Sequence, residues 1–185
     1  STGRLKEAVA NYTRSMQEFE WDADSPYRIG RIFFRQKEPG RALLFAREAL
    51  RREPQFPDAM NLTARIYLQA GLIDAADSQA ADSLALNSLD KDTLLLLAEI
   101  RRRQGKPDEE IAFLARAALE ARNVQSTMVL ADRLTTAGDH QQAIQLYERV
   151  VHSRNADRYY RVQAAMLAGL LRARFDRDAV AAHGF

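Results

Sequence analysis

The chain has 185 residues, of which 46% are hydrophobic and 28% charged, and its net charge is +2. This composition favours a packed protein over a disordered one, and the nearly balanced charge predicts neither nucleic acid nor a membrane surface as a partner. The absence of cysteine excludes disulfides, a thiolate nucleophile and cysteine–zinc sites.

No stretch reaches the roughly 20 apolar residues that a membrane-spanning helix needs, so direct membrane insertion is not expected. The chain opens with Ser1-Thr2-Gly3 and no basic-then-apolar signal segment follows. We expect a fragment of a larger bacterial protein whose signal segment is missing. The bacterial periplasm and the cytoplasm are the two alternatives for its location.

Helical periodicity begins in residues 4–21, where Leu5, Val9, Tyr12 and Met16 recur at three- and four-residue spacing. The stretch from residue 35 to 54 then predicts a turn near Lys37–Gly40 and a helix that ends before Pro54. This pattern returns along the chain with a nearly constant period. The matching positions carry Ala42, Ala76, Glu110 and Ala143.

A repeat of this length predicts successive pairs of helices. In chain order we expect helices over Tyr27–Gln36, from Lys37–Gly40 to Pro54, Pro57–Ala70, Leu72–Leu86, Lys91–Gln104, Lys106–Ala121, Val124–Ala137, Asp139–His152 and Tyr159–Ala173, and another from Asp176 to Phe185. Gly71, Gly105 and Gly138 are expected at turns, because glycine adopts positive φ without steric cost. Gly30 is expected where two helix backbones approach closely.

The pairs predict an all-α fold and one solenoid over residues 1–185, with about four full repeats and a partial repeat at each end. The expected divisions are a half repeat at 1–22, repeats at 23–56, 57–90, 91–123 and 124–156, and a partial repeat at 157–185. An array cut within a repeat exposes apolar stacking faces, here near Leu5, Val9, Met16 and Val180, so self-association through uncapped ends is expected.

These repeats resemble the tetratricopeptide repeat family, in which two antiparallel helices occupy about 34 residues. The first full repeat carries the resemblance through Ile29, Gly30, Phe33, Ala42, Ala49, Leu50 and Pro54, and later repeats through Ala64, Tyr67, Gly71, Ala98, Gly105, Ala117, Ala131, Gly138, Ala143 and Tyr147. The resemblance implies a right-handed α-solenoid whose first helices line a concave groove that binds peptides, helices or protein surfaces. Two charged residues depart from the pattern: we expect Glu110 to reach solvent and Arg101 to extend its head into water.

Arginines and aromatic residues share the groove face of the first helices, and this combination is typical of binding hot spots. Helical spacing places eight candidate residues in a partner-binding groove: Tyr27, Arg31, Phe34, Arg35, Asn61, Arg65, Leu68 and Arg102. We expect a protein or peptide partner, acidic in character. The competing interpretation is an ordinary solvated face on which Arg31 and Arg65 pair with Asp58.

Catalytic residues, cofactors and metal sites are not expected. The three histidines show no metal-ligand spacing, and no nucleophile motif occurs. We therefore predict a non-catalytic protein–protein interaction scaffold. An alternative is a periplasmic polymer-handling or assembly module of an exopolysaccharide export machine, with a polysaccharide as its ligand. A third is a regulatory subunit whose enzyme lies elsewhere in the full chain.

Overall fold

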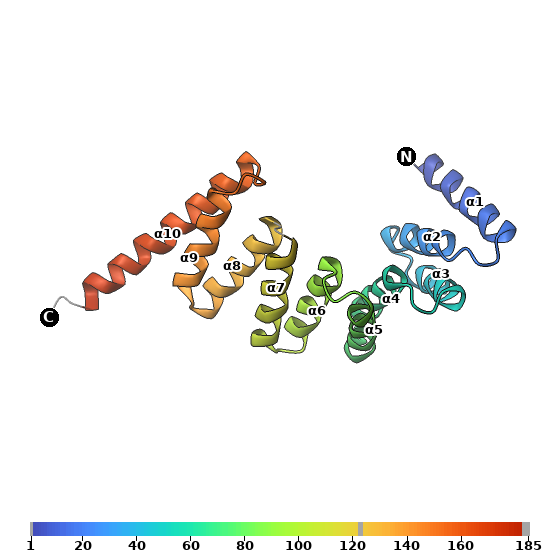
Figure 1. Ribbon diagram of the computed structural model, residues 1–185, viewed down its shortest axis with the longest axis horizontal. Helices are drawn as coiled ribbons and strands as arrows, with labels where there is room; N and C mark the ends of the chain where they lie inside the picture. The colour runs from blue at the N-terminus through green and yellow to red at the C-terminus, as the bar shows by residue number, and fades with distance from the viewer. Residues whose placement is uncertain (1, 122–123, 183–185) are drawn as a thin grey trace. The chain divides into compact units, whose positions relative to one another are not determined.

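The computed structural model describes residues 2–121 and 124–182, and this part of the chain is all-helical (Figure 1). It divides into two compact units, Ser1–Lys106 and Pro107–Phe185. The boundary lies within the repeat predicted at 91–123. The predicted division into repeats within a single solenoid stays a prediction.

The first unit contains two helix pairs, α2 with α3 and α4 with α5, with a single helix before them and another after them. Its helices are α1 (Thr2–Glu18), α2 (Asp24–Arg35), α3 (Pro39–Arg52), α4 (Pro57–Gln69), α5 (Ile73–Leu86) and α6 (Lys91–Arg103). Helix α2 packs against α3, and α4 packs against α5. Because α2 and α4 also contact each other, as do α4 and α6, the first helices of successive pairs lie side by side.

The turns of the first unit follow the predicted period. Gly71 and Gly105 have φ of 77° and 72°, which confirms the role expected for these glycines. In the first turn the left-handed residue is Lys37, with φ of 60°, and not Gly40. Position 37 lies one repeat period before Gly71. Gly40 belongs to α3, which starts with Pro39 because proline is well suited to the first turn of a helix.

Small residues allow the helices of the first pair to approach closely. Ala42, Ala46 and Ala49 of α3 are fully buried. A Cβ added to Gly30 would lie 3.1 Å from Leu62 Cδ2 and 3.2 Å from the Ala42 carbonyl oxygen. The predicted close approach at Gly30 is therefore confirmed, and it brings α2 against both α3 and α4.

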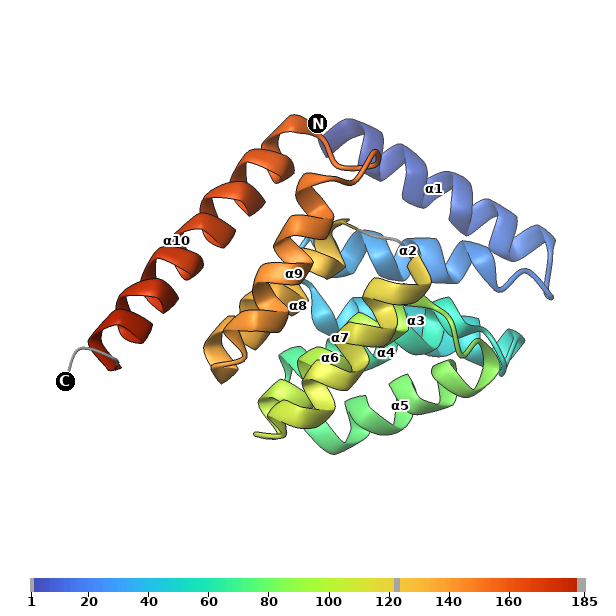
Figure 2. The ribbon, with the colours of Figure 1, turned by 60° about the vertical axis from the view of Figure 1, so that its left-hand side comes forward.

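The second unit contains the helices α7 (Pro107–Ala121), α8 (Val124–Ala137), α9 (His140–Val151) and α10 (Arg158–Ala182). Helix α8 packs on α7 and α9, and α10 packs on α9 (Figure 2). The turn between α8 and α9 uses Gly138 with φ of 88°, as predicted. Tyr147 of α9 is buried, and its hydroxyl donates to Asp132 Oδ1 of α8 at 2.5 Å.

The last helix differs from the prediction. Two helices were expected, over Tyr159–Ala173 and from Asp176, whereas α10 is a single helix of 25 residues. The segment between the two predicted helices is Arg174-Phe175, which contains no glycine or proline, and the alanine, leucine and arginine residues just before it favour continued helix. The earlier turns each have a left-handed residue at this point, and α10 has none among its described residues.

Two charged residues also differ from expectation, because each finds a tertiary partner. Glu110 does not reach solvent: it is 7% exposed, and its Oε1 lies 2.8 Å from Arg133 Nε of α8. Arg101 does not extend into water either, since its Nη1 lies 2.7 Å from Asp77 Oδ2 of α5. Burial of a charged group in this way requires a paired and hydrogen-bonded partner.

The predicted stacking faces at the ends are described only in part. Val9 and Met16 are half-buried, whereas the side chains of Leu5 and Val180 lie outside those that the structure describes. Self-association stays a prediction. Across residues 2–121 and 124–182, no helix combines the length and the apolar character required to cross a membrane.

Candidate functional site

A pocket of about 340 Å³ lies on the first helices of the pairs in the first unit. Each of α2, α4 and α6 contributes to its wall. The residues that line it are Tyr27, Arg31, Phe34, Arg35, Asp58, Asn61, Leu62, Arg65 and Asp92. The first helices of the repeats therefore form a concave surface in this unit.

A second pocket, of about 350 Å³, continues this surface because it shares Phe34 and Arg65 with the first. Its remaining lining residues come from the later turns of α4 and from α6 and are Leu68, Gln69, Leu95, Leu96, Glu99 and Arg103. We call the two pockets together the α2–α4–α6 groove.

The groove brings together seven of the eight predicted site residues. The exception is Arg102, which is absent from the described lining of both pockets, while its neighbour Arg103 is present. Arg102 Nε lies 2.8 Å from Glu99 Oε2 on the same helix. Three successive arginines point to different sides of a helix, so sequence spacing did not distinguish Arg102 from Arg103.

Asn61 lines the groove but also joins α4 to α6. Its side chain is buried, and its Nδ2 donates to Thr93 Oγ1 at 2.7 Å. The Thr93 hydroxyl donates in turn to Asp90, which fixes Thr93 Oγ1 as the acceptor for Asn61. Asn61 is therefore held in one orientation. Its partners belong to the next helix pair, so helical spacing alone could not show this role.

The arginines of the groove differ from many others in the first unit. Arg28, Arg41 and Arg52 pair with Asp24, Glu38 and Glu48, respectively. Within the described residues, none of Arg31, Arg35 and Arg65 forms an ion pair. The interpretation in which Arg31 and Arg65 pair with Asp58 is therefore wrong in this structure.

Aromatic side chains hold part of the arginine surface in place. The Arg31 guanidinium carbon lies 5.5 Å from the centroid of the Tyr27 ring, which is a cation–π distance. Tyr27 in turn packs edge-on against Phe56, with 5.2 Å between the ring centroids. This contact orients Arg31 without neutralising its charge.

Two carboxylates, Asp58 and Asp92, also line the first pocket of the groove. Asp24, Asp58 and Asp92 recur at the repeat period, each in the first turn of its helix, where the helix dipole favours a negative charge. Burial raises the pKa of Asp58, the charge of Asp90 raises it further, and Arg31 opposes the change. Burial and the Asp58 charge likewise raise the pKa of Tyr27. In the first pocket, Asp58 and Asp92 at the helix starts lie beside Arg31, Arg35 and Arg65 from later turns, and in the second pocket Glu99 lies beside Arg65 and Arg103.

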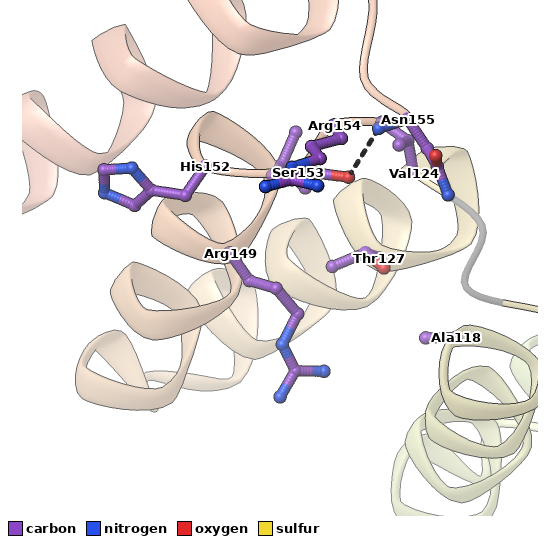
Figure 3. A pocket seen from close by; sticks show the side chains of 9 residues that line it. Ala118, Val124, Thr127, Arg149, His152, Ser153, Arg154 and Asn155 are labelled. Carbon is purple, nitrogen blue, oxygen red and sulfur yellow. Dashed lines mark hydrogen bonds between the residues drawn. The ribbon is translucent and has the colours of Figure 1, made fainter.

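The second unit has a larger pocket, of about 650 Å³, beside the connection from α9 to α10 (Figure 3). Its lining includes Arg149, His152 and Arg154, but Figure 3 shows the Arg149 and His152 side chains pointing in different directions. The Asn155 backbone N–H donates to Ser153 Oγ at 3.2 Å, which closes the local turn. These polar groups do not converge on one point. No cluster of metal-ligating side chains occurs among the residues that the structure describes.

Comparison with known proteins finds a model of the tetratricopeptide repeat that matches residues 27–85 and 62–126. Together the two matches span residues 27–126, which is more than half of the chain. A comparison with curated proteins finds no match.

Solved structures share this fold at low sequence identity. PilF of Pseudomonas aeruginosa has a TM-score of 0.77 and 17% identity, over 99% of this chain and 82% of that one. TTC0263, a TPR protein of Thermus thermophilus, has a TM-score of 0.69 and 19% identity, over 90% and 91%. YrrB, described as a TPR protein with an unusual peptide-binding site, has a TM-score of 0.68 and 17% identity, over 89% and 84%.

Proposed function

Because the chain belongs to the tetratricopeptide repeat family, whose fold serves protein–protein interaction, we propose that it is a non-catalytic scaffold that binds a partner segment in the α2–α4–α6 groove. The segment is acidic and carries an apolar anchor. One observation carries this proposal: Arg31, Arg35 and Arg65 line a concave surface beside Tyr27 and Phe34 without an ion pair to any described carboxylate.

An unpaired arginine in a groove favours an anionic ligand for a physical reason. Its planar guanidinium can donate two parallel hydrogen bonds to one carboxylate. A partner carboxylate gains these bonds without first breaking an internal pair. Tyr27 and Phe34 add apolar area next to the arginines, so an aromatic or aliphatic anchor of the partner can be buried there.

The carboxylates at the helix starts make the site selective. Asp58 and Asp92 line the same pocket as the arginines, and they repel a segment that is acidic along its whole length. The favoured segment therefore places its acidic residues beside Arg31, Arg35 and Arg65, and neutral or basic residues beside Asp58 and Asp92. This arrangement also sets the direction in which the segment lies across the helices.

The similarity to YrrB supports a peptide as the ligand class, since that protein is described as having a peptide-binding site and shares the fold over 89% of this chain. In our proposal the chain is part of a larger bacterial protein, and the groove serves as its recognition module.

A polysaccharide is the second candidate ligand, as part of an exopolysaccharide export machine. The observation that favours it is the presence of Asp58 and Asp92 beside Tyr27, because carboxylates and aromatic rings together can bind sugar hydroxyls and ring faces. Binding of a neutral polymer depends on Tyr27 and Phe34 and is insensitive to the arginines. An acidic peptide depends on both.

The test uses a synthetic peptide with four aspartates next to one leucine anchor, and the same peptide with lysines in place of the aspartates. Calorimetric titration should show that the aspartate peptide binds the parent and that the Arg31→Glu, Arg65→Glu variant binds it at least tenfold more weakly. The matched control, Arg47→Glu with Arg51→Glu, changes the net charge equally on α3, outside the groove lining. Equal loss in both variants would show that net charge alone drives binding, and the proposal would be wrong.

A further inference from the structure

A third pocket of the first unit, of about 220 Å³, lies between α1 and α2. The residues that line it are Ala8, Tyr12, Arg28, Arg31, Ile32 and Arg35. It shares Arg31 and Arg35 with the first pocket of the α2–α4–α6 groove, so the groove surface continues onto α1. We call this third pocket the α1–α2 pocket.

Three arginines of α2 line the α1–α2 pocket, and their spacing of three and four residues places them on one face of the helix. Within the described residues, neither Arg31 nor Arg35 forms an ion pair. Arg28 pairs with Asp24, and its guanidinium carbon lies 5.9 Å from the centroid of the Tyr12 ring of α1, which is a cation–π distance. All three guanidinium groups therefore belong to the wall of one pocket.

No carboxylate appears in the described lining of the α1–α2 pocket, whereas both pockets of the groove have at least one. The acidic residues closest to the lining in sequence are Glu7, Asp24 and Glu38, and the last two have arginine partners. Glu7 precedes Ala8 in α1, and one residue turns a helix by about 100°, so Glu7 lies on a different side of α1 from Ala8. The pocket therefore keeps a net positive charge.

Position 28 also distinguishes this pocket from the equivalent places in later repeats. One and two repeat periods further on, the same position carries Leu62 and Leu96, which are 5% and 3% exposed. Leu62 lies against Gly30 of the preceding first helix. Arg28 is exposed and charged instead, so this wall is suited to an anionic ligand where its counterparts make an apolar contact.

We infer that the partner segment carries a run of successive acidic residues, and that this run extends past Arg31 and Arg35 into the α1–α2 pocket. The inference rests on the proposed function, because the segment reaches this pocket from the α2–α4–α6 groove. Packed helices lie about 8–10 Å apart and an extended chain advances about 3.3 Å per residue, so about three further residues cross from α2 to α1. One isolated carboxylate beside Arg31 would not reach the pocket.

The distribution of charge then determines which part of the segment lies over which helices. The acidic run lies over α1 and α2, where arginines line a pocket without a described carboxylate. The part of the segment over α4 and α6 lies beside Asp58, Asp92 and Glu99, so it is neutral or basic. The segment therefore has its acidic end at α1.

The test changes the charge of the wall that α1 contributes and leaves every arginine in place. Ala8 lines the pocket and is half-buried, whereas Ala10 is exposed on the same helix and belongs to the described lining of none of the three pockets. Ala10→Glu is therefore the matched control for Ala8→Glu. The probe is the four-aspartate peptide with its leucine anchor, prepared with the leucine at either end.

Calorimetric titration of the four-aspartate peptide should show binding at least about threefold weaker to Ala8→Glu and at least about threefold tighter to Ala8→Arg, because carboxylates of the run lie beside position 8. Ala10→Glu should bind like the parent. A second peptide keeps the two aspartates next to the leucine and has serines in place of the other two. Its acidic run is too short to reach α1, so the parent and the three variants should bind it equally.

Shifts of the same sign in Ala8→Glu and Ala8→Arg would indicate a packing effect and would overturn the inference. Equal binding of the four-aspartate peptide to Ala8→Glu and Ala10→Glu would overturn it as well. If the Arg31→Glu, Arg65→Glu variant loses binding while position 8 has no effect, the inference is wrong and the proposed function stands. If the parent does not bind the four-aspartate peptide, both are wrong.

Discussion

At the scale of single residues, Gly30 determines how closely α2 approaches its neighbours. Gly30→Leu should lower the free energy of unfolding by about 1–3 kcal/mol, since added atoms meet Leu62 and the α3 backbone. Urea unfolding measures this loss. Gly40→Leu is the control, because a Cβ at Gly40 meets no atom within 4 Å. A Gly30→Leu protein that unfolds like the parent would show that the helices are not in close contact there.

Lys37 occupies a left-handed turn position that glycine fills at the corresponding places in later turns. A side chain in this conformation costs about 1–2 kcal/mol, part of which glycine loses again through the entropy of the unfolded chain. Lys37→Gly should therefore raise the free energy of unfolding by about 0.5–1 kcal/mol. Gly71→Ala, at φ of 77°, should have the opposite effect. If thermal unfolding shows Lys37→Gly to be destabilising, the turn does not have the conformation described.

At the scale of elements, the ion pair between Glu110 of α7 and Arg133 of α8 should respond unequally to removal of its two partners. Arg133→Ala leaves the buried Glu110 carboxylate unpaired and should cost about 1–3 kcal/mol. Glu110→Ala leaves the partly exposed Arg133, which can turn to water, and should cost less.

The double variant should recover most of the loss seen in Arg133→Ala, because no buried charge then remains. Chemical denaturation of the three variants gives the coupling energy. Equal costs for the two single variants, with additive behaviour in the double variant, would show that Glu110 is not a buried charge in need of Arg133.

The elements also show what the sequence could predict. Helix positions before α10, the turns at Gly71, Gly105 and Gly138 and the close approach at Gly30 follow from local chemistry and a fixed period, and the structure agrees. The burial of Glu110 and the locking of Asn61 depend on Arg133 and Thr93, which belong to helices further along the chain. No local pattern specifies such partners. Helix α10 is continuous because the sequence has no glycine or proline near residue 174 to end it. The prediction placed a turn there only because the repeat period called for one.

The candidate groove was predictable to a similar extent. Helical spacing brought Tyr27, Arg31, Phe34, Arg35 and Arg65 onto one surface, because first helices of successive repeats present equivalent positions. It could not choose between Arg102 and Arg103, which are adjacent at the end of α6. It also did not show that Arg31 and Arg65 lack an ion pair with Asp58, since that depends on side-chain geometry across two helices.

At the scale of the whole molecule, the α2–α4–α6 groove is the concave surface of the first unit. We propose that this groove, in which Arg31, Arg35 and Arg65 lie beside Tyr27 and Phe34, binds an extended acidic segment. The second unit exposes apolar side chains on one face of α10, at Tyr159, Val162, Met166 and Leu170.

The central claim is that the groove recognises carboxylates through Arg31 and Arg65, and a charge exchange tests it most directly. The Arg31→Glu, Arg65→Glu variant is titrated at low salt with the lysine form of the anchor peptide, and the parent with the aspartate form. We expect the exchanged pair to bind within tenfold of the original pair, and each mismatched pair to bind at least tenfold more weakly than its matched counterpart. A variant that still prefers the aspartate peptide would contradict the account.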